Sequence, residues 1–399
     1  MKPRARRIFI VAGEHSGDHL GGKLMAALKA RSEVPILFSG VGGEMMEAEG
    51  MRSIFPLSDV AVMGPLAILA HLPKLVRRVY QTVDAALAAD ADGVIIIDSP
   101  EFTHPIAKRI RRKKPLIPII DYVSPSVWAW RPGRAKKMAP YVDHLLAILP
   151  FEPEAHERLG GPPCSYVGHP MIEKLDWIRE LDAQELATRL ALDPAKPVLL
   201  VLPGSRPTEV RRLMEPFGQA VAGLMENVGP MEVILPAVDS VRPLIEEALK
   251  GWPIQPHLVS GQDDKFKAFK LAKAALAASG TVTLELGLAG VPMVVAYKVD
   301  WLAERLRFLL KVPSVVLANL VIGQNVFPEL LQEDCTPEKL TEALLPLFGD
   351  TPERARQLAG LGTIADKMVL DHGTPSERAA ETALAIIEEG VKKRLTVPR

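Results

Sequence analysis

Two short segments of the chain combine a glycine turn with side chains that suit a nucleotide. Residues Ala278-Ser-Gly-Thr-Val-Thr-Leu-Glu285 follow a small apolar run and predict a strand, a tight turn and the start of a helix. A helix start presents free backbone N–H groups and a positive dipole end, which suit a phosphate or a diphosphate. Glu285 lies about one turn inside this helix, where its carboxylate can accept hydrogen bonds from a ribose diol.

The second segment lies upstream of the first. The apolar run Val198–Leu202 leads into Pro-Gly-Ser-Arg, so Gly204, Ser205 and Arg206 come just after a predicted strand. Glycine in such a turn lets a ligand approach the backbone closely. Together the two segments indicate a nucleotide-diphosphate site built from strand ends.

A third strand end carries a candidate general base. Asp98 comes directly after three isoleucines, so its carboxylate lies near apolar packing. Such a carboxylate can have a raised pKa and can accept a proton from a hydroxyl group. Three alternatives stay open: Asp98 caps the helix that follows Pro100, or Glu101 or Glu14 is the base. The position of Glu101 also suits a partner for the dipole of that helix.

The first predicted strand ends in a glycine-rich segment with ionisable side chains, Ala12 to Gly22. Its glycines would let polar groups of a ligand reach the backbone, but the strict G-x-G-x-x-G spacing of a dinucleotide fingerprint is absent. His15 and His19 have a spacing that can hold zinc with Glu14 or Asp18. Because a glycine between the histidines favours a turn, we predict no metal site.

Two further segments carry aromatic, basic or apolar side chains. The segment Tyr122–Arg131 has two tryptophans beside serines, and it suits a sugar face or a loop packed beneath the site. The basic run Lys108–Lys114 predicts a solvated helix face. The segment Val60–Tyr80 has more apolar residues than one helix face needs, together with several cations. It predicts either a core helix or a helix in a membrane interface with its cations toward anionic head groups.

The order of apolar runs predicts the fold class. Unalternating apolar runs separated by helical stretches indicate parallel sheets buried on both faces, and two sets of runs indicate two doubly wound α/β domains. We place these domains at 1–185 and 186–370, facing a central cleft, with a final helix at 371–399 that can reach back to the first. Ligands are expected at the carboxyl ends of the strands. The predicted strands are 8–12, 36–39, 94–98, 117–122, 144–149, 165–167, 198–202, 232–235, 256–259, 274–277, 293–297 and 315–317.

Composition restricts the partners and the compartment. The chain has 399 residues and a formal net charge of zero, which gives no global attraction to nucleic acid. Residues 1–170 contain 22 Lys and Arg against 17 Asp and Glu, so only the first half is expected to meet an anionic surface. Two cysteines favour a reducing compartment. No run approaches the ~20 apolar residues of a spanning helix, and we predict a soluble or peripheral protein.

In this order, the strand ends resemble those of the lipid-A-disaccharide synthase family, inverting glycosyltransferases of bacterial outer-membrane lipid assembly. The resemblance covers roughly residues 8–335, and Ser124-Pro-Ser-Val-Trp-Ala-Trp-Arg131 is its most specific motif. It implies the GT-B fold, which agrees with two doubly wound domains. The other matching segments are 12–18, 40–43, 97–102, 148–152, 166–170, 202–206, 279–285 and 328–332.

The resemblance also implies an activity. Members transfer 2,3-diacylglucosamine from UDP-2,3-diacylglucosamine to 2,3-diacylglucosamine 1-phosphate (lipid X), and they form a β-1,6-linked disaccharide 1-phosphate and UDP. The reaction inverts the anomeric centre and needs neither a metal nor a cofactor. Because its substrates are acylated, the protein is expected to be peripheral, on the cytoplasmic face of the inner membrane. This favours the exposed interpretation of Val60–Tyr80. We expect a monomer or a homodimer. The residues that we assign to the membrane surface are Met63, Leu66, Ile68, Leu69, Leu72, Lys74, Arg77 and Arg78.

The resemblance also implies roles for the residues of this chain that match the family motifs by position. Asp98 resembles the base for the 6-hydroxyl of the acceptor sugar, Arg206 the diphosphate clamp and Glu285 the ribose ligand. The other donor-side residues are Gly204, Ser205, Gly280, Thr281, Asn325 and Gln332. The acceptor-side residues are Glu14, Ser16, Gly17, Asp18, Ser124 and Trp128. The chain departs from the common family pattern at His15, His19, Glu101, Thr103 and Gln324.

Two competing functions follow from the same residues. One is another GT-B enzyme that uses an unacylated UDP-sugar, such as an epimerase or an N-acetylglucosaminyl transferase. The apolar segment Val60–Tyr80 argues against it. The other is a non-catalytic module that binds a nucleotide or a lipid, and the presence of both Asp98 and Arg206 argues against that.

Overall fold

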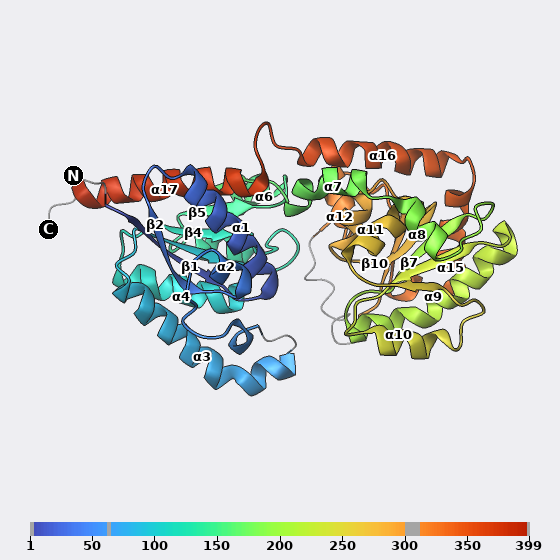
Figure 1. The fold of residues 1–399 in the computed structure, drawn as a ribbon, viewed down its shortest axis with the longest axis horizontal. Coiled ribbons are helices and arrows are strands. Elements are labelled where there is room, and N and C mark those ends of the chain that lie inside the picture. Colours follow the sequence, from blue (N-terminus) through green and yellow to red (C-terminus); the bar gives the residue numbers. More distant parts are fainter. Residues whose placement is uncertain (1–3, 62–64, 300–311, 397–399) are drawn as a thin grey trace. The chain divides into compact units, whose positions relative to one another are not determined.

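The chain folds into two compact units. The computed structural model describes residues 4–61, 65–299 and 312–396, and all of their side chains except those of 65–70. The first unit consists of Met1–Glu173 with Leu370–Arg399, and the second unit consists of Lys174–Val369. Each unit is a parallel sheet covered by helices (Figure 1). Both have the doubly wound α/β architecture predicted from the order of apolar runs.

The first sheet has six parallel strands in the order β2-β1-β3-β4-β5-β6. The chain enters at β1 near the middle of the sheet, and the strand order reverses between β1 and β3. In open α/β sheets such a switch point lies beside the ligand site, at the carboxyl ends of the strands. The strands are β1 (Arg6–Ala12), β2 (Ile36–Val41), β3 (Gly93–Ile97), β4 (Ile119–Tyr122), β5 (His144–Ala147) and β6 (Cys164–Tyr166).

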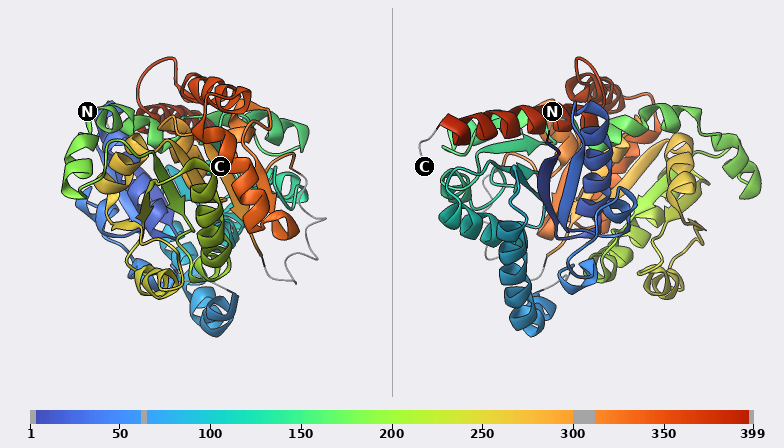
Figure 2. Two further views of the ribbon diagram at one scale, coloured as in Figure 1. Left: turned by 90° about the vertical axis from the view of Figure 1, so that its right-hand side faces the viewer. Right: turned by 60° about the vertical axis from the view of Figure 1, so that its left-hand side comes forward.

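The two faces of the first sheet bury alternate side chains under different helices. Phe9 and Val11 pack in the core beneath α3 and α4, whereas Ile8 and Ile10 pack in the core beneath α1 and α17. The views in Figures 1 and 2 show α17 along one face of this sheet and α3 along the other. The helices are α1 (His15–Arg31), α2 (Glu44–Ala48), α3 (Pro65–Ala88), α4 (Pro100–Lys113), α5 (Gly133–Met138), α6 (Glu152–Arg158) and α17 (Pro375–Thr396).

The last helix, α17, belongs to the first unit. Arg31 of α1 forms ion pairs with Glu377 and Glu381 of α17. The hydroxyl and the backbone N–H of Ser376 both donate to the Glu173 carboxylate, at 2.7 and 3.0 Å. These bonds and the buried apolar face of α17 fasten the end of the chain to the first sheet.

The second sheet also has six parallel strands, in the order β12-β11-β10-β7-β8-β9. Its strands are β7 (Val198–Leu202), β8 (Glu232–Pro236), β9 (His257–Val259), β10 (Ala274–Ala278), β11 (Met293–Tyr297) and β12 (Glu329–Leu331). Its principal helices are α9 (Pro207–Val228), α10 (Arg242–Leu249), α11 (Gln262–Leu271), α12 (Val282–Leu288), α14 (Leu317–Ile322), α15 (Pro337–Leu344) and α16 (Pro352–Met368).

One predicted strand is wrong. The run 315–317 leads into α14, and the edge strand is β12. Asn319 of α14 accepts hydrogen bonds from Val326 N and Phe327 N, both at 2.9 Å, and so folds the following loop back on the helix. A short apolar run of this kind does not by itself distinguish a buried strand from a buried helix.

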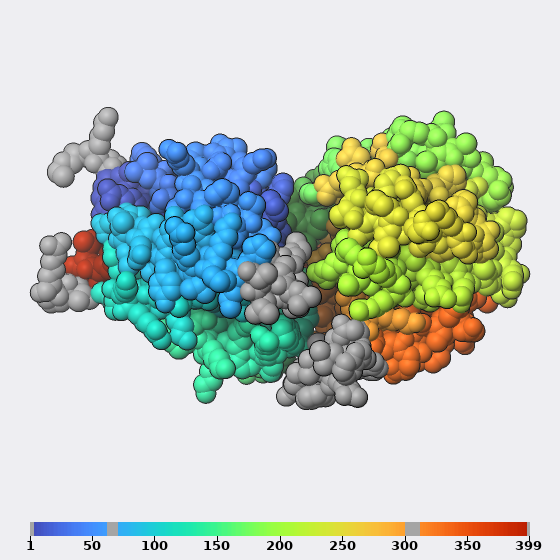
Figure 3. Space-filling model, turned by 90° about the horizontal axis from the view of Figure 1, so that it is seen from below, coloured from blue at the N-terminus to red at the C-terminus, as the bar shows by residue number. Residues whose placement is uncertain are grey.

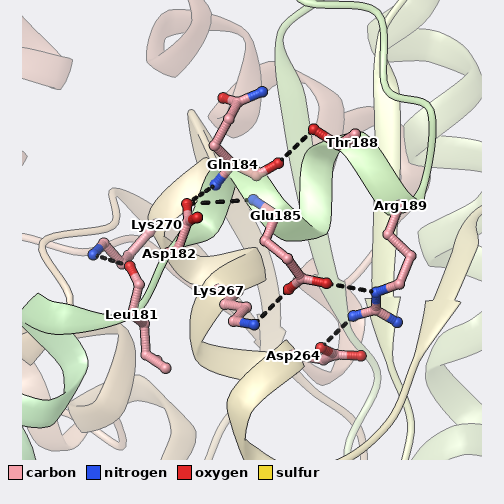
Figure 4. Close-up of polar contacts among 9 residues, drawn as sticks. All are labelled: Leu181, Asp182, Gln184, Glu185, Thr188, Arg189, Asp264, Lys267 and Lys270. Carbon is pink, nitrogen blue, oxygen red and sulfur yellow. Dashed lines mark hydrogen bonds and ion pairs between the residues drawn. The ribbon is translucent and has the colours of Figure 1, made fainter.

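The division between the units falls after Glu173, earlier than the boundary that we placed at 185/186. The short helices α7 (Leu175–Glu180) and α8 (Ala183–Arg189) belong to the second unit because polar contacts tie them to α11 (Figure 4). Glu185 and Arg189 form ion pairs with Lys267 and Asp264, and Lys270 Nζ donates to Leu181 O at 2.6 Å.

Candidate functional site

The second unit contains a cavity of about 630 Å³ at the carboxyl ends of its central strands. Loops after β7, β8, β9 and β10 line it, because parallel strands bring their carboxyl ends to one edge of the sheet. This volume is in the range of pockets that enclose a small organic ligand. The predicted donor-side residues that line the cavity are Gly204, Ser205, Arg206, Gly280, Thr281 and Glu285.

Two predicted donor-side residues do not line this cavity. Asn325 Nδ2 donates to Pro313 O at 3.1 Å, and Gln332 Oε1 accepts from Val299 N at 2.6 Å. Each side chain therefore holds a neighbouring loop in the structure. Their role in donor binding remains a prediction from the family resemblance.

Glu209 organises the turn that carries Arg206. Its carboxylate accepts from Ser205 N at 3.1 Å and Arg206 N at 3.2 Å, and its second oxygen lies 3.2 Å from Arg206 Nη1. Gly204 has a φ of +106°, and a Cβ there would collide with the Glu209 carboxylate. The N–H groups of Ser205 and Arg206 are thus already bonded to protein. The capacity of this turn to clamp a diphosphate therefore lies in the Arg206 side chain, which is 68% exposed.

Sequence reasoning missed Glu209, although one signal was present. An acidic residue three positions after a helix cap is the second half of a capping box, and Arg206 and Glu209 have this spacing. The turn around Arg206 was identified, but its supporting carboxylate was not.

Lys265 of α11 forms an ion pair with Glu285 of α12, and both line the cavity. The pair engages one oxygen of the Glu285 carboxylate, Oε2. Lys265 therefore adds a second cation to the cavity beside Arg206. Nothing in the sequence pointed to Lys265, because it lies on a helix face twenty residues before its partner.

The turn before α12 presents open backbone donors to the same cavity. Within the described chain, the N–H groups of Gly280 and Thr281 have no protein acceptor. Thr281 is the N-cap residue of α12, and its side chain makes no capping bond. These open donors and the exposed Arg206 side chain can bind an anion, although Glu209, Asp239 and Glu285 also line the cavity and Lys265 is paired with Glu285.

In the first unit, Asp98 follows β3 in an unusual backbone conformation. Asp98 has a φ of +51° and Ser99 a φ of +45°, both in the left-handed region that non-glycine residues rarely adopt. Asp98 Oδ1 accepts from Ser99 N at 2.7 Å, and Asp98 O accepts from Thr103 Oγ1 at 2.8 Å. These two bonds hold the turn, as expected where strain is stored at a functional position.

The environment of Asp98 suits a general base. Burial raises the pKa of its carboxyl above the usual range, the bond from Ser99 N opposes this, and the charges of Glu14 and Asp121 raise it further. The capping alternative is not supported, because Ser99 is the N-cap of α4 and no side chain caps that helix. The competing base, Glu101, is exposed and forms an ion pair with Arg134 at 2.5 Å.

The predicted acceptor-side residues near β1 have different roles. Ser16 is exposed and Glu14 is half-buried at the start of α1, while Gly17 packs against the backbone of Ile97. The assignment of Asp18 to the acceptor sugar is not supported. Its buried carboxylate accepts from the backbone N–H groups at the start of α2, which are those of Gly43 (2.7 Å), Met45 (3.1 Å) and Met46 (3.1 Å).

The loop after β4 carries two predicted acceptor-side residues, Ser124 and Trp128, and their environments differ. The Ser124 hydroxyl is buried and lies 2.7 Å from His156 Nε2, so it faces the interior rather than a ligand. Trp128 is half-buried and donates from Nε1 to Glu152 Oε1 at 3.1 Å. Only Trp128 keeps part of its surface available to a sugar.

Residues 8–385 match the family model described as lipid-A-disaccharide synthetase. The chain belongs to the lipid-A-disaccharide synthase family. It is 50% identical over 388 residues to a lipid-A-disaccharide synthase of Rhodopseudomonas palustris strain HaA2. The aligned region covers 96% of this chain and 97% of that synthase.

Two solved structures are similar in fold to this chain. A UDP-GlcNAc 2-epimerase from Neisseria meningitidis, bound to UDP-GlcNAc, has a TM-score of 0.60, with 11% identity over 96% of this chain and 100% of that one. A MurG protein from Acinetobacter baumannii has a TM-score of 0.55, with 13% identity over 96% and 99%. At this identity they show the fold alone, which is the GT-B fold expected of the synthase family.

The exposed face of α3 carries an apolar stripe. Leu72, Val76 and Tyr80 are 47%, 45% and 52% exposed, and their spacing of four residues places them on one stripe. Val79 and Val83 are buried in the core on the opposite side. Figure 3 views the first unit from the side of α3, in light blue. One side of α3 is therefore packed in the core, as expected of a core helix, and the other side is exposed, as expected of a helix in a membrane interface.

We predicted that Lys74, Arg77 and Arg78 of α3 face the membrane surface, but two of them pair with an acidic residue of the first unit. Lys74 and Arg78 both bond to Asp59, at 2.6 Å and 3.0 Å, so their charges are partly neutralised within the unit. The hydrogen bond from Lys74 is the main cause that holds the pKa of Asp59 below its usual range. Arg77 is exposed.

The side chains of four residues that we assigned to the membrane surface are not among those that the structure describes. Met63 lies outside the described residues, and the described side chains do not include Leu66, Ile68 and Leu69. No helix in the described parts of the chain is both long and apolar enough to cross a membrane. Among the same residues, no cluster of three metal-ligating side chains forms around His15 and His19.

Proposed function

We propose that this chain transfers 2,3-diacylglucosamine from UDP to the 6-hydroxyl of 2,3-diacylglucosamine 1-phosphate, with inversion at the anomeric carbon. The observation that carries the proposal is the cavity of about 630 Å³ at the carboxyl ends of the strands, whose lining includes Arg206, Lys265 and Glu285. Membership of the synthase family selects the substrates. The products are the β-1,6-linked disaccharide 1-phosphate and UDP.

The donor site stabilises the leaving group. As the sugar–oxygen bond breaks, negative charge accumulates on the diphosphate of UDP. Arg206 provides a permanent guanidinium charge, and Lys265 provides a second cation in the lining of the same cavity. The open N–H groups of Gly280 and Thr281 add fixed dipoles. In this proposal these protein groups stabilise the developing charge, and Glu285 binds the ribose through the oxygen that is not paired with Lys265.

Asp98 activates the nucleophile. The oxygen of the 6-hydroxyl attacks the anomeric carbon while its proton passes to the Asp98 carboxylate. A raised pKa makes the ionised Asp98 carboxylate a better proton acceptor than that of an ordinary aspartate. The left-handed turn at Asp98 and Ser99 fixes the direction of this carboxylate.

The exposed stripe Leu72–Val76–Tyr80 meets the membrane that supplies the acylated substrates. Apolar side chains on one helix face with a cation beside them suit the boundary between head groups and acyl chains. Arg77 supplies that cation, while Lys74 and Arg78 are held by Asp59. We assign the protein to the cytoplasmic leaflet of the inner membrane, as a peripheral protein.

The direct test is to incubate the purified protein with both acylated substrates in mild detergent, with and without a chelator, and to follow disaccharide and UDP by mass. The Asp98→Asn variant serves as the matched control. Disaccharide from the wild type but not from the variant supports the proposal. UDP binding without disaccharide, or turnover of an unacylated UDP-sugar alone, overturns it.

A further inference from the structure

Behind the loop that follows β4 lies a buried polar cluster that the proposed reaction does not use. It consists of Ser124 from the loop, Glu152 at the start of α6 and His156 one turn later. All three are buried, and Glu152 and His156 are ionisable. Burial of a carboxyl group is costly unless its oxygens receive hydrogen bonds, so this cluster needs a reason.

The Glu152 carboxylate joins two loops. Its Oε1 accepts from Trp128 Nε1 at 3.1 Å, and its Oε2 accepts from Leu149 N at 3.0 Å. The Trp128 ring also packs edge-on against Phe151, with ring centroids 5.1 Å apart. Trp128 is therefore fixed at both its polar and its apolar side, and Glu152 provides the polar hold.

The hydrogen bond between His156 and Ser124 has a definite direction. Burial lowers the pKa of His156 to about 4, so its ring is neutral at ordinary pH. Within the described residues His156 Nδ1 has no partner, and a Cβ on Gly161 would lie 2.5 Å from it. The proton therefore belongs on Nε2, which donates to Ser124 Oγ at 2.7 Å. The Ser124 hydroxyl then donates onward, to Pro125 O at 2.9 Å or to Glu152.

We propose that Glu152 is a positioning residue for the acceptor sugar: its ionised carboxylate holds Trp128 and the loop 123–131 in the conformation that binds this substrate. The proposal rests on the function proposed above for the same site. Glu152 acts through Trp128, which keeps part of its surface exposed, and does not itself touch the substrate.

Protonation of Glu152 removes this hold. A protonated carboxyl carries an O–H donor, and one of its oxygens would then face Trp128 Nε1–H or Leu149 N–H, which are donors too. Burial raises the pKa of Glu152 to about 7, although bonds from Leu149, Trp128, Ile148 and Ser124 oppose the shift. The ionised form therefore prevails above about pH 7.

The other ionisable groups around Glu152 do not change charge in this range. His156 on the same helix is neutral, and burial raises the pKa of Cys164 and of Tyr166 on β6. Glu152 is thus the group of this cluster that titrates between pH 6 and 8. Binding of the acceptor sugar is expected to weaken as the pH falls through about 7.

The first experiment compares Glu152→Gln with Glu157→Gln, an exposed position on the same helix. The glutamine has the size of glutamate, but its amide nitrogen cannot accept from Trp128 or Leu149. An unpaired buried donor costs about 1–3 kcal/mol, which corresponds to a rise of about 5- to 150-fold in the KM for the acceptor sugar. The Kd for UDP and the kcat at saturating acceptor sugar should change less than about threefold. An unchanged KM in Glu152→Gln, with disaccharide still formed, overturns the proposal.

A second variant keeps the test decisive if Glu152→Gln fails to fold. Trp128→Phe keeps the ring but removes the N–H, so it breaks the same bond from the other side. It should also raise the KM, and the double variant should add little to the larger single effect. Additive effects overturn the coupling between Glu152 and Trp128.

The pH dependence separates this role from that of the base. In the wild type, the KM for the acceptor sugar should rise as the pH falls from 8 to 6, whereas loss of the base affects kcat. In Glu152→Gln the KM should be high, and between pH 6 and 8 it should vary only as far as the substrate's own phosphate titrates, with a second pKa of about 6. If the wild type forms no disaccharide, the proposed function fails, whereas a wild-type KM that does not vary with pH contradicts the role of Glu152 alone.

Discussion

The exchange of Asp98 for asparagine tests the proposed base with little change to the fold. Asp98 Oδ1 accepts from Ser99 N at 2.7 Å, and an asparagine oxygen can keep this bond. Asparagine also tolerates the left-handed conformation, which Asp98 adopts with a φ of +51°. The substitution therefore removes the capacity to take a proton and leaves the turn in place. We expect kcat to fall by about 10²–10⁴-fold, the usual contribution of a general base.

Binding of UDP provides the control for this variant. The cavity lies in the second unit, whereas Asp98 lies in the first unit, so the Kd for UDP measured by calorimetry should be unchanged. The assay is the rate of disaccharide formation in a single turnover, with enzyme in excess over the UDP donor. A variant that retains a third or more of the wild-type rate would refute the reasoning, as would a loss of UDP affinity that accounts for the lost rate.

The pH profile of kcat gives a second check on the same group. Only ionised Asp98 accepts a proton, so the rate falls as the pH falls through its pKa. Because burial raises the pKa of Asp98, this decline should begin at a higher pH than for an exposed aspartate. The decline should be absent from the residual activity of Asp98→Asn. A decline of the same position in both proteins would assign it to another group.

Three further substitutions test the donor site and the membrane surface. Arg206→Ala should lower kcat by about 10²–10³-fold, as for loss of one strong donor to a developing anion, whereas Arg211→Ala on the same helix should not; equal rates contradict the clamp. Lys265→Ala should weaken UDP binding about 5- to 100-fold in low salt, because it removes a cation and leaves the Glu285 carboxylate unpaired; unchanged calorimetric affinity would exclude Lys265 from the site. Arg77→Glu should reduce binding to anionic vesicles about tenfold or more, at about 1 kcal/mol per charge, and unchanged sedimentation with vesicles would remove α3 from the membrane surface.

Much of the fold could be predicted because buried parallel strands leave a strong signal. Val198–Leu202 is an unbroken apolar run between polar turns, and β7 has the same bounds. The edge strand β12 was missed because it has only three residues, all half-buried, and begins with Glu329. The apolar residues 315–317 predict a strand that does not form. In the structure Leu317 begins α14, and Asn319 of this helix accepts from Val326 N and Phe327 N of the loop that leads to β12.

The site was predictable where chemistry follows a strand. Arg206 and Glu285 reach the cavity because they come just after β7 and β10. Lys265 reaches it from α11, which packs against β7 and β8, and Glu209 from one turn behind Arg206. No spacing in the sequence distinguishes such residues from other charged residues on helices. The carboxyl end of a strand is a fixed place in the fold, whereas a helix face becomes part of a site only through packing.

The motif residues divide by what their polar atoms already contact. Asp18 uses its carboxylate to cap α2, Ser124 points into the buried cluster, and Lys74 pairs with Asp59. These residues hold the loops and helices of the site. Asp98 differs because only its Oδ1 accepts a bond, from its neighbour Ser99, and in the described chain no protein donor reaches Oδ2. A half-buried carboxylate with an uncommitted oxygen keeps its capacity to accept a proton. Asp98 combines this with a place directly after β3 and with burial that raises its pKa, and for these reasons it is the base that we propose.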